Sequence, residues 1–241
     1  MLFPASFPQL SLAVAILAST AGTYVALSPP NPNTKSKPST GDLMHRLHLT
    51  NKHITNLVSI PLGFLALHTS TLAYLYPNIP PLIIRHGAAN GLNSDLVTWS
   101  GATTIPLALI LCAGIPLRLV SYASLGKNFT FALAEPDSLN TTEVYRYVQH
   151  PSYTGIAVLI ACHAALLGRA DGALACWIPP RWYGALRALE TTLLVHVVGV
   201  SLLAFAVWTR VRQEERMLRA RFGIEWESWH AKTARFIPWI F

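Results

Sequence analysis

YRYVQHPSYTG, residues 145–155, places polar, aromatic and cationic side chains directly before an apolar run, residues 156–167. A second polar cluster, RVRQEE at residues 210–215, directly follows another apolar run. Pro151 suits the first turn of a helix, where its missing N–H costs nothing, so we expect His150 where a loop enters that helix. Backbone N–H groups are free at such a junction and can hold an anionic or polar ligand. The two clusters therefore predict one site, built at a membrane surface.

The composition indicates a polytopic membrane protein. Of the 241 residues, 52% are apolar and only 12% are charged, with a mean hydropathy of +0.38, whereas soluble domains carry roughly 25% charged residues. A single integral-membrane domain, residues 1–241, is the simplest organisation. The net charge of +7 does not indicate a nucleic-acid partner, because the basic residues flank apolar segments, as the positive-inside rule expects. The three cysteines show no paired metal-ligand spacing, so no metal site is expected.

Five apolar segments are candidates to cross a bilayer, for which a helix needs about 20 residues. They predict an all-α fold, a polytopic membrane helix bundle of about five transmembrane segments. The fourth segment is the weakest, because the sequence GRADG at residues 168–172 interrupts it. A short helix pair that enters the bilayer and returns is an alternative there. The expected spans are residues 3–27, 54–76, 96–117, 152–178 and 186–209.

The distribution of basic residues predicts the orientation. With five spans, the loops 28–53 and 118–150 and the tail 210–241 lie on one side of the membrane. They hold 4, 3 and 7 of the 18 Lys and Arg residues, and the other 4 fall on the opposite side. Because basic loops stay in the cytosol, this 14:4 asymmetry places the C-terminus in the cytosol and brings both polar clusters to the cytosolic face.

The two clusters resemble a known family. The HPSYxG core of residues 150–155 is similar to the signature of isoprenylcysteine carboxyl methyltransferases, and the LGKNF sequence at residues 125–129 also resembles that family. The tail is similar to the family's ending, with an Arg, a Glu-Glu pair and spaced aromatic residues between 210 and 238. The resemblance covers residues 118–241, a methyltransferase core, whereas residues 1–117 match only in hydropathy. The motifs are shared with a wider superfamily that includes phospholipid N-methyltransferases and membrane sterol reductases.

The resemblance implies an enzyme of the endoplasmic reticulum membrane that uses S-adenosyl-L-methionine. It assigns the substrate, and hence a catalytic role, to Arg210, and it places the loop 138–140 around the cofactor. Two positions depart from the family: Gln149 stands where Arg is usual, and Glu143 replaces the Gly of a Gly-x-Tyr turn. The residues that the resemblance assigns to cofactor binding are Tyr145, His150, Pro151, Ser152, Tyr153 and Glu214.

Other interpretations of these residues stay open from the sequence. Arg210 and Glu214 share a helix face at spacing i, i+4, and they could form only a surface ion pair, worth on the order of 0.5 kcal/mol. His150 could simply cap the loop. The aromatic residues of the tail could form an interfacial belt or line a tunnel for a prenyl chain. These aromatic residues are Trp226, Trp229, Phe236, Trp239 and Phe241.

The implied reaction transfers a methyl group to the C-terminal carboxylate of a prenylated cysteine. A carboxylate is already a nucleophile at neutral pH, so the site must mainly align the reactants, which can be worth roughly 7–11 kcal/mol. The guanidinium fork of Arg210 can bind both carboxylate oxygens. The expected partners are prenylated protein C-termini, or prenylcysteine itself, that enter laterally from the membrane lipid.

Two rival functions are compatible with the sequence. Phospholipid N-methylation would need a base for its amine nucleophile, which Glu214 or Glu215 could supply, although Arg210 beside an amine acceptor would be unfavourable. A non-catalytic membrane protein on the same scaffold is the second rival, and the departures at Gln149 and Glu143 are the reason to consider it.

Overall fold

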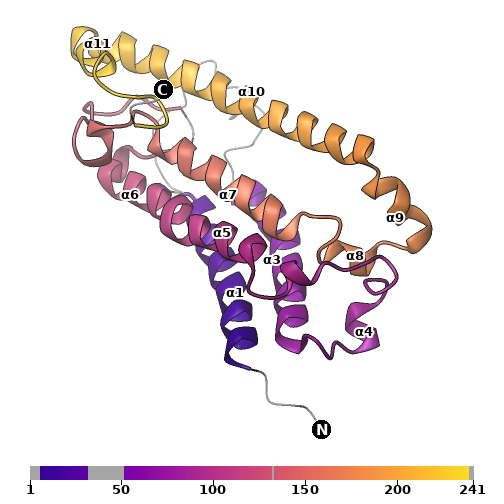
Figure 1. Cartoon of the computed structure of the whole chain (residues 1–241). Coiled ribbons are helices and arrows are strands. Elements are labelled where there is room, and N and C mark those ends of the chain that lie inside the picture. The colour runs from indigo at the N-terminus through magenta and orange to yellow at the C-terminus, as the bar shows by residue number, and fades with distance from the viewer. Residues whose placement is uncertain (1–5, 32–51, 132, 239–241) are drawn as a thin grey trace.

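The computed structural model describes residues 6–31, 52–131 and 133–238, and it is built from helices with no strand among these residues (Figure 1). This confirms the all-α fold. Helices long and apolar enough to cross a membrane account for four candidate spans, at 7–27, 55–75, 94–128 and 191–222. The long helices are α1 (Phe7–Leu27), α3 (Lys52–Leu75), α5 (Gly101–Leu109) continued by the π-helical turn η2 (Ile110–Gly114) and α6 (Ile115–Leu125), α7 (Pro151–Leu167) and α10 (Leu189–Phe222). The short helices are α4 (Pro81–Ile84), η1 (Ser94–Leu96), η3 (Gly126–Asn128), η4 (Glu143–Arg146), α8 (Leu174–Trp177), α9 (Pro180–Arg187) and α11 (Ile224–His230).

The expected fourth span is α7, an apolar helix of 17 residues. At 1.5 Å per residue it is about 25 Å long, which is near the lower limit for crossing a bilayer. Figure 1 shows α7 running from the end of the bundle where α6 ends to the opposite end, where α8 lies. The helix ends after Leu167, at the interruption that the sequence predicted. Helix α7 nevertheless crosses the bundle, and it is not the first half of a short helix pair that returns to the same side.

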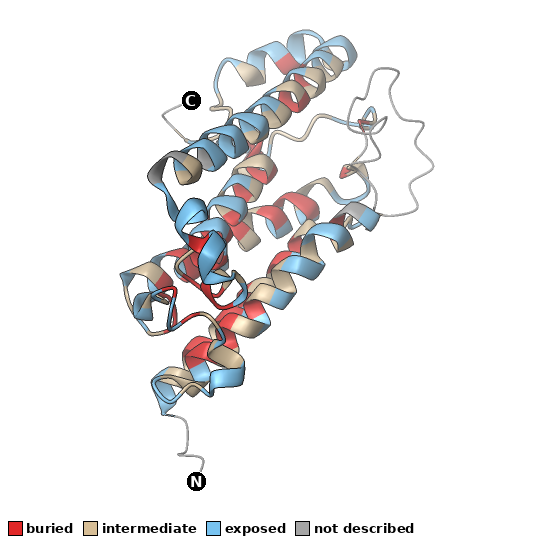
Figure 2. Ribbon diagram, turned by 90° about the vertical axis from the view of Figure 1, so that its right-hand side faces the viewer, coloured by how far each residue is buried: buried red, intermediate tan, exposed pale blue. Residues whose placement is uncertain are grey.

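The core lies where α1, α3, α5, η2 and α7 meet, and Figure 2 shows the buried residues gathered on the facing sides of these helices. Close approach of α7 to the helix before it depends on two glycines. A Cβ on Gly155 would lie 3.0 Å from Arg118 Cγ and 3.0 Å from the Gly114 carbonyl oxygen, and a Cβ on Gly114 would lie 2.7 Å from a methyl group of Leu159. The glycine of the HPSYTG stretch therefore sets the distance between α6 and α7.

The third span is longer than expected. It was expected to end at Leu117, but the helix continues to Leu125. Arg118 therefore lies inside α6 with 3% of its surface exposed, and its assignment to a polar loop was wrong. The π-helical turn lies between Pro106 and Pro116, and each proline lacks the N–H of a regular helix.

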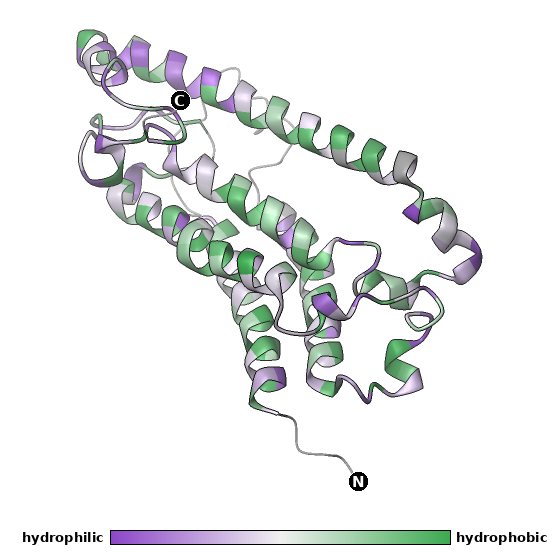
Figure 3. Cartoon of the chain, in the orientation of Figure 1, coloured by the Kyte–Doolittle hydropathy of each residue, from purple (hydrophilic) through white to green (hydrophobic). Residues whose placement is uncertain are grey.

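Helix α10 is 34 residues long, or about 50 Å, and it continues past the expected end of the fifth span. Figure 3 shows its N-terminal part as apolar and its C-terminal part as hydrophilic. None of its most apolar 18-residue stretch is buried within the described chain, and its main helix contacts are with α9 and α11. Arg210 and Glu214 therefore lie on one continuous helix, as expected.

Candidate functional site

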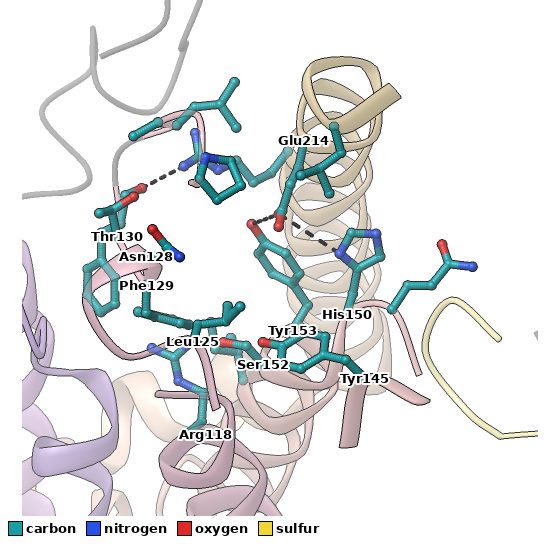
Figure 4. Close-up of a pocket in the computed structure, with 18 of the residues that line it drawn as sticks. Arg118, Leu125, Asn128, Phe129, Thr130, Tyr145, His150, Ser152, Tyr153 and Glu214 are labelled. Atoms are coloured by element: carbon teal, nitrogen blue, oxygen red, sulfur yellow. Dashed lines mark hydrogen bonds and ion pairs between the residues drawn. The ribbon is translucent and has the colours of Figure 1, made fainter. Parts of the chain in front are cut away.

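The predicted site residues converge on one cavity of about 430 Å³ at the end of the bundle where α6 ends and α7 begins (Figure 4). Its walls come from the start of α7, the C-terminal half of α10 and the segment that follows α6. Pro151 does not line the cavity; it occupies the first turn of α7, as expected. The predicted residues that line it are Tyr145, His150, Ser152, Tyr153, Arg210 and Glu214.

His150 lies at the junction that the sequence predicted, directly before the first helical residue of α7. Its side chain makes no capping hydrogen bond, so the interpretation of His150 as a simple cap is wrong. The ring is 3% exposed, with Nδ1 3.9 Å from Glu214 Oε2 and Nε2 3.7 Å from Glu215 Oε1. The imidazole is therefore held between two neighbouring carboxylates of α10.

Glu214 and two tyrosines form the polar wall of the cavity. The Tyr153 hydroxyl donates a hydrogen bond of 3.0 Å to Glu214 Oε2, as the dashed line in Figure 4 marks. Burial raises the pKa of the Tyr145 phenol, and the negative charge of Glu214 raises it further. Tyr145 therefore keeps its proton at neutral pH and can donate a hydrogen bond to an occupant of the cavity.

Arg210 is buried, with 7% of its surface exposed, and its Nη2 donates a 2.6 Å hydrogen bond to the carbonyl oxygen of Phe131. A solvated ion pair on a helix surface does not describe this residue, so that interpretation was wrong. The bond to Phe131 ties the middle of α10 to the segment after α6, across the cavity. It also fixes one end of the guanidinium group.

Arg118 was missed as a site residue. Its Nε donates to the Ala26 carbonyl oxygen at 2.9 Å, and its two terminal nitrogens donate to the hydroxyls of Ser152 and Tyr122. Figure 4 shows it at the floor of the cavity, and the described structure gives it no ion pair with a carboxylate. A charged residue that directly follows a long apolar run is a signal that could have identified it, because ionisable groups within spans are costly and are mostly retained for function.

Both departures from the family pattern have a structural explanation. Glu143 has a φ of +51°, the left-handed region that glycine adopts most easily, and its carboxylate accepts a hydrogen bond from the Ser124 hydroxyl. Gln149 is 4% exposed and holds the C-terminal tail, because its amide nitrogen donates to the Thr233 carbonyl oxygen at 2.8 Å. Because the Gln149 amide oxygen can only accept, the 2.8 Å contact with His230 is a hydrogen bond donated by the Nδ1–H of the ring.

The tail aromatics turn inward in the part of the chain that the structure describes. Trp229 lines the cavity, and its indole N–H donates to the Tyr145 carbonyl oxygen at 2.9 Å. Trp226 is 6% exposed and stacks on His230. Trp239 and Phe241 lie outside the described residues. Trp226 and Trp229 therefore do not belong to an exposed aromatic belt.

Comparison with known protein families finds a match over part of the chain. Residues 107–178 match the model of the isoprenylcysteine carboxyl methyltransferase (ICMT) family. The match begins within the third span, contains the cavity residues from Arg118 to Tyr153, and ends before the polar cluster of α10. A search of the curated proteins finds no significant match to this chain. This multi-pass membrane protein therefore resembles the isoprenylcysteine carboxyl methyltransferase family over residues 107–178, which are 72 of its 241 residues.

Proposed function

We propose that this protein transfers a methyl group from S-adenosyl-L-methionine to the C-terminal carboxylate of a prenylated cysteine. The observation that carries the proposal is that one end of the cavity is lined by charged side chains and the other by apolar ones. Arg210 and Glu214 line it near the end of the bundle, whereas Ile160 on α7 and Ala206 on α10 line it further along the apolar parts of the same helices. Such a cavity suits a ligand with a charged head and a hydrocarbon chain.

The residues of the cavity fit the proposed cofactor. Its volume of about 430 Å³ lies within the range of roughly 300–1,000 Å³ for small-molecule sites. The Glu214 carboxylate and the rings of Phe129 and Tyr145 line it, and carboxylates and aromatic faces both attract cations. When bound, S-adenosyl-L-methionine supplies a methyl group on a sulfonium, and the electron pair of the broken C–S bond stays on sulfur.

The chain itself supplies alignment. Arg210 can present its planar fork to the two oxygens of the acceptor carboxylate, and the bond to Phe131 holds that fork in place. Arg118, hydrogen-bonded to Ser152, adds a second buried positive charge beside the same cavity. No proton has to be removed from a carboxylate, so the site works without a general base.

Phospholipid N-methylation fits the geometry less well. An amine acceptor needs a base, but Glu214 accepts a hydrogen bond from Tyr153 and Glu215 is paired with Arg235 at 2.7 Å. Two buried guanidinium groups also disfavour a cationic acceptor. The test is an assay of the purified protein with labelled S-adenosyl-L-methionine, which compares a farnesylcysteine analogue with phosphatidylethanolamine. We expect methylation of the first only; methylation of the lipid alone would overturn the proposal, and absence of cofactor binding would favour the non-catalytic alternative.

We further propose that the chain is one integral-membrane unit of the endoplasmic reticulum, with its C-terminus and the two polar clusters, residues 145–155 and 210–215, on the cytosolic side. Two potential glycosylation sites, at Asn128 and Asn140, would then remain unmodified. The Asn140 amide nitrogen donates to the Ser124 carbonyl oxygen at 2.8 Å, which agrees with an unmodified side chain. A glycosylation reporter fused after Phe241 tests the orientation: modification of the reporter in the lumen would contradict it.

A further inference from the structure

The C-terminal tail packs against the start of α7. Ala234 pairs with Val148 in a single parallel bridge, and the backbone N–H groups of Gln149 and His150 donate to the carbonyl oxygens of Ala234 and Arg235 at 2.8 and 2.9 Å. The Thr154 hydroxyl extends the contact by donating to the Phe236 carbonyl oxygen at 2.8 Å. The tail therefore covers the loop–helix junction on which the cavity residue His150 stands.

Glu215 connects this tail to α10. The residue is 6% exposed, and its Oε1 accepts a 2.7 Å hydrogen bond from Arg235 Nε. The same oxygen lies 3.7 Å from His150 Nε2, while the other ring nitrogen lies 3.9 Å from Glu214. Neither Glu215 nor Arg235 lines the cavity. Neither residue therefore touches an occupant there directly, whereas His150, which faces Glu215, does line the cavity.

We propose that Glu215 and Arg235 are positioning residues of the cavity, which hold the His150 imidazole in the orientation that faces Glu214 and the bound cofactor. The inference rests on the proposed function, because it takes His150 to contact S-adenosyl-L-methionine. Two adjacent glutamates of α10 then have different tasks. Glu214 lines the cavity, and Glu215, about 100° further around the helix, anchors the tail behind it.

The exposed ion pair between Arg219 and Glu227 is the matched control. It joins the same helix to α11 at 2.8 Å, but its side chains are 66% and 48% exposed. Ion pairs of this kind contribute little, and neither residue lines the cavity. Arg219→Ala and Glu227→Gln should bind the cofactor like the wild type.

The test measures S-adenosyl-L-methionine affinity on the purified full chain, together with the melting temperature. Glu215→Gln keeps the shape and the hydrogen-bond acceptor but removes the charge, and Arg235→Ala removes the partner altogether. We expect affinity about tenfold weaker in Arg235→Ala, the loss of roughly one charge-assisted contact, and a smaller loss in Glu215→Gln. Arg235→Lys keeps the ion pair and should recover part of the loss.

Because removing one partner of a buried pair can unfold a protein, the neutral double variant Glu215→Gln/Arg235→Gln is measured as well. A positioning role weakens cofactor binding in folded protein while the KM for the prenylcysteine analogue stays near the wild-type value. If folded Glu215→Gln and the double variant both bind the cofactor as the wild type does, the inference is overturned and the pair only stabilises the fold. Wild-type protein that binds no S-adenosyl-L-methionine would overturn the proposed function, and this inference with it.

Discussion

Helices α7 and α10 each form one wall of the candidate site, but they are held in the molecule in different ways. Along α7, Leu159 and Leu166 are each 1% exposed and Gly155 packs against α6. Along the apolar part of α10, Val200 and Phe205 are 65% and 67% exposed. Apolar packing therefore fixes one wall of the cavity, whereas polar contacts near the end of α10 hold the other.

This difference predicts where a single substitution acts. On α7 a change of volume should affect the fold and the site together. On α10 a change in the exposed apolar part before Ala206, which lines the cavity, should affect neither, while a change in the polar part should affect the site alone. Three sets of variants test the comparison, and a fourth tests the turn that precedes Tyr145.

The largest effect is expected at Arg210. Arg210→Lys keeps the charge but loses the planar fork, and the loss of a charge-assisted contact of roughly 1.5–3 kcal/mol corresponds to an approximately 10- to 150-fold lower kcat/KM. Cofactor affinity should survive, because Arg210→Lys leaves the side chains of Glu214 and the His150–Tyr153 stretch in place. Methyl transfer and cofactor affinity are both measured.

Arg212→Lys is the control, since Arg212 is exposed two residues further along the same helix, and it should retain full activity. Normal turnover in Arg210→Lys would refute the role in carboxylate binding. A loss of both methyl transfer and cofactor affinity would instead indicate that Arg210 belongs to the cofactor site.

The comparison of packing is tested with two glycines. Gly155→Ala places a Cβ 3.0 Å from both Arg118 Cγ and the Gly114 carbonyl oxygen, and overpacking of this kind costs about 1–3 kcal/mol of folding free energy. Gly199 on α10 has no neighbour within 4 Å of an added Cβ, so Gly199→Ala should be neutral or slightly stabilising. Thermal unfolding in detergent measures both. Equal melting temperatures for the two variants would contradict the difference between α7 and α10.

A smaller effect is expected for Tyr153→Phe, which removes the hydrogen bond between α7 and Glu214. The net loss of about 0.5–1.5 kcal/mol should weaken cofactor affinity by roughly 2- to 12-fold without unfolding the protein. Tyr147→Phe is the control, because Tyr147 is 55% exposed and does not line the cavity. The same affinity in both variants would exclude Tyr153 from the cofactor site.

The smallest effect is expected at Glu143. Glu143→Ala and Glu143→Gly both lose the hydrogen bond with Ser124, so the difference between them reports only the backbone. At a φ of +51° the glycine variant should be more stable than the alanine variant by about 1 kcal/mol, measured by thermal unfolding. If the alanine variant were as stable as the glycine variant, the left-handed backbone conformation at Glu143 would be contradicted.

Much of the fold follows from local patterns. Apolar runs predicted the long helices, and Pro151 predicted where α7 begins, because both signals depend only on neighbours in the chain. The sequence also predicted that the stretch at His150 and the cluster at Arg210 meet. The apolar segment after His150 leads away across the bundle, and the apolar segment before Arg210 leads back. Their convergence on one cavity agrees with that prediction, while their roles stay proposals.

Tertiary structure alone decided which polar residues are buried and what they contact. The family resemblance pointed to Glu214, which lines the cavity, but nothing in the sequence indicated that Glu215 pairs with Arg235. Arg118 looked like one loop charge among others until its contacts with Ala26 and Ser152 were seen. These contacts join residues far apart in the chain, and they depend on the distance and rotation between packed helices. Periodicity and composition carry no information about either quantity, so they can predict the helices but not the contacts between them.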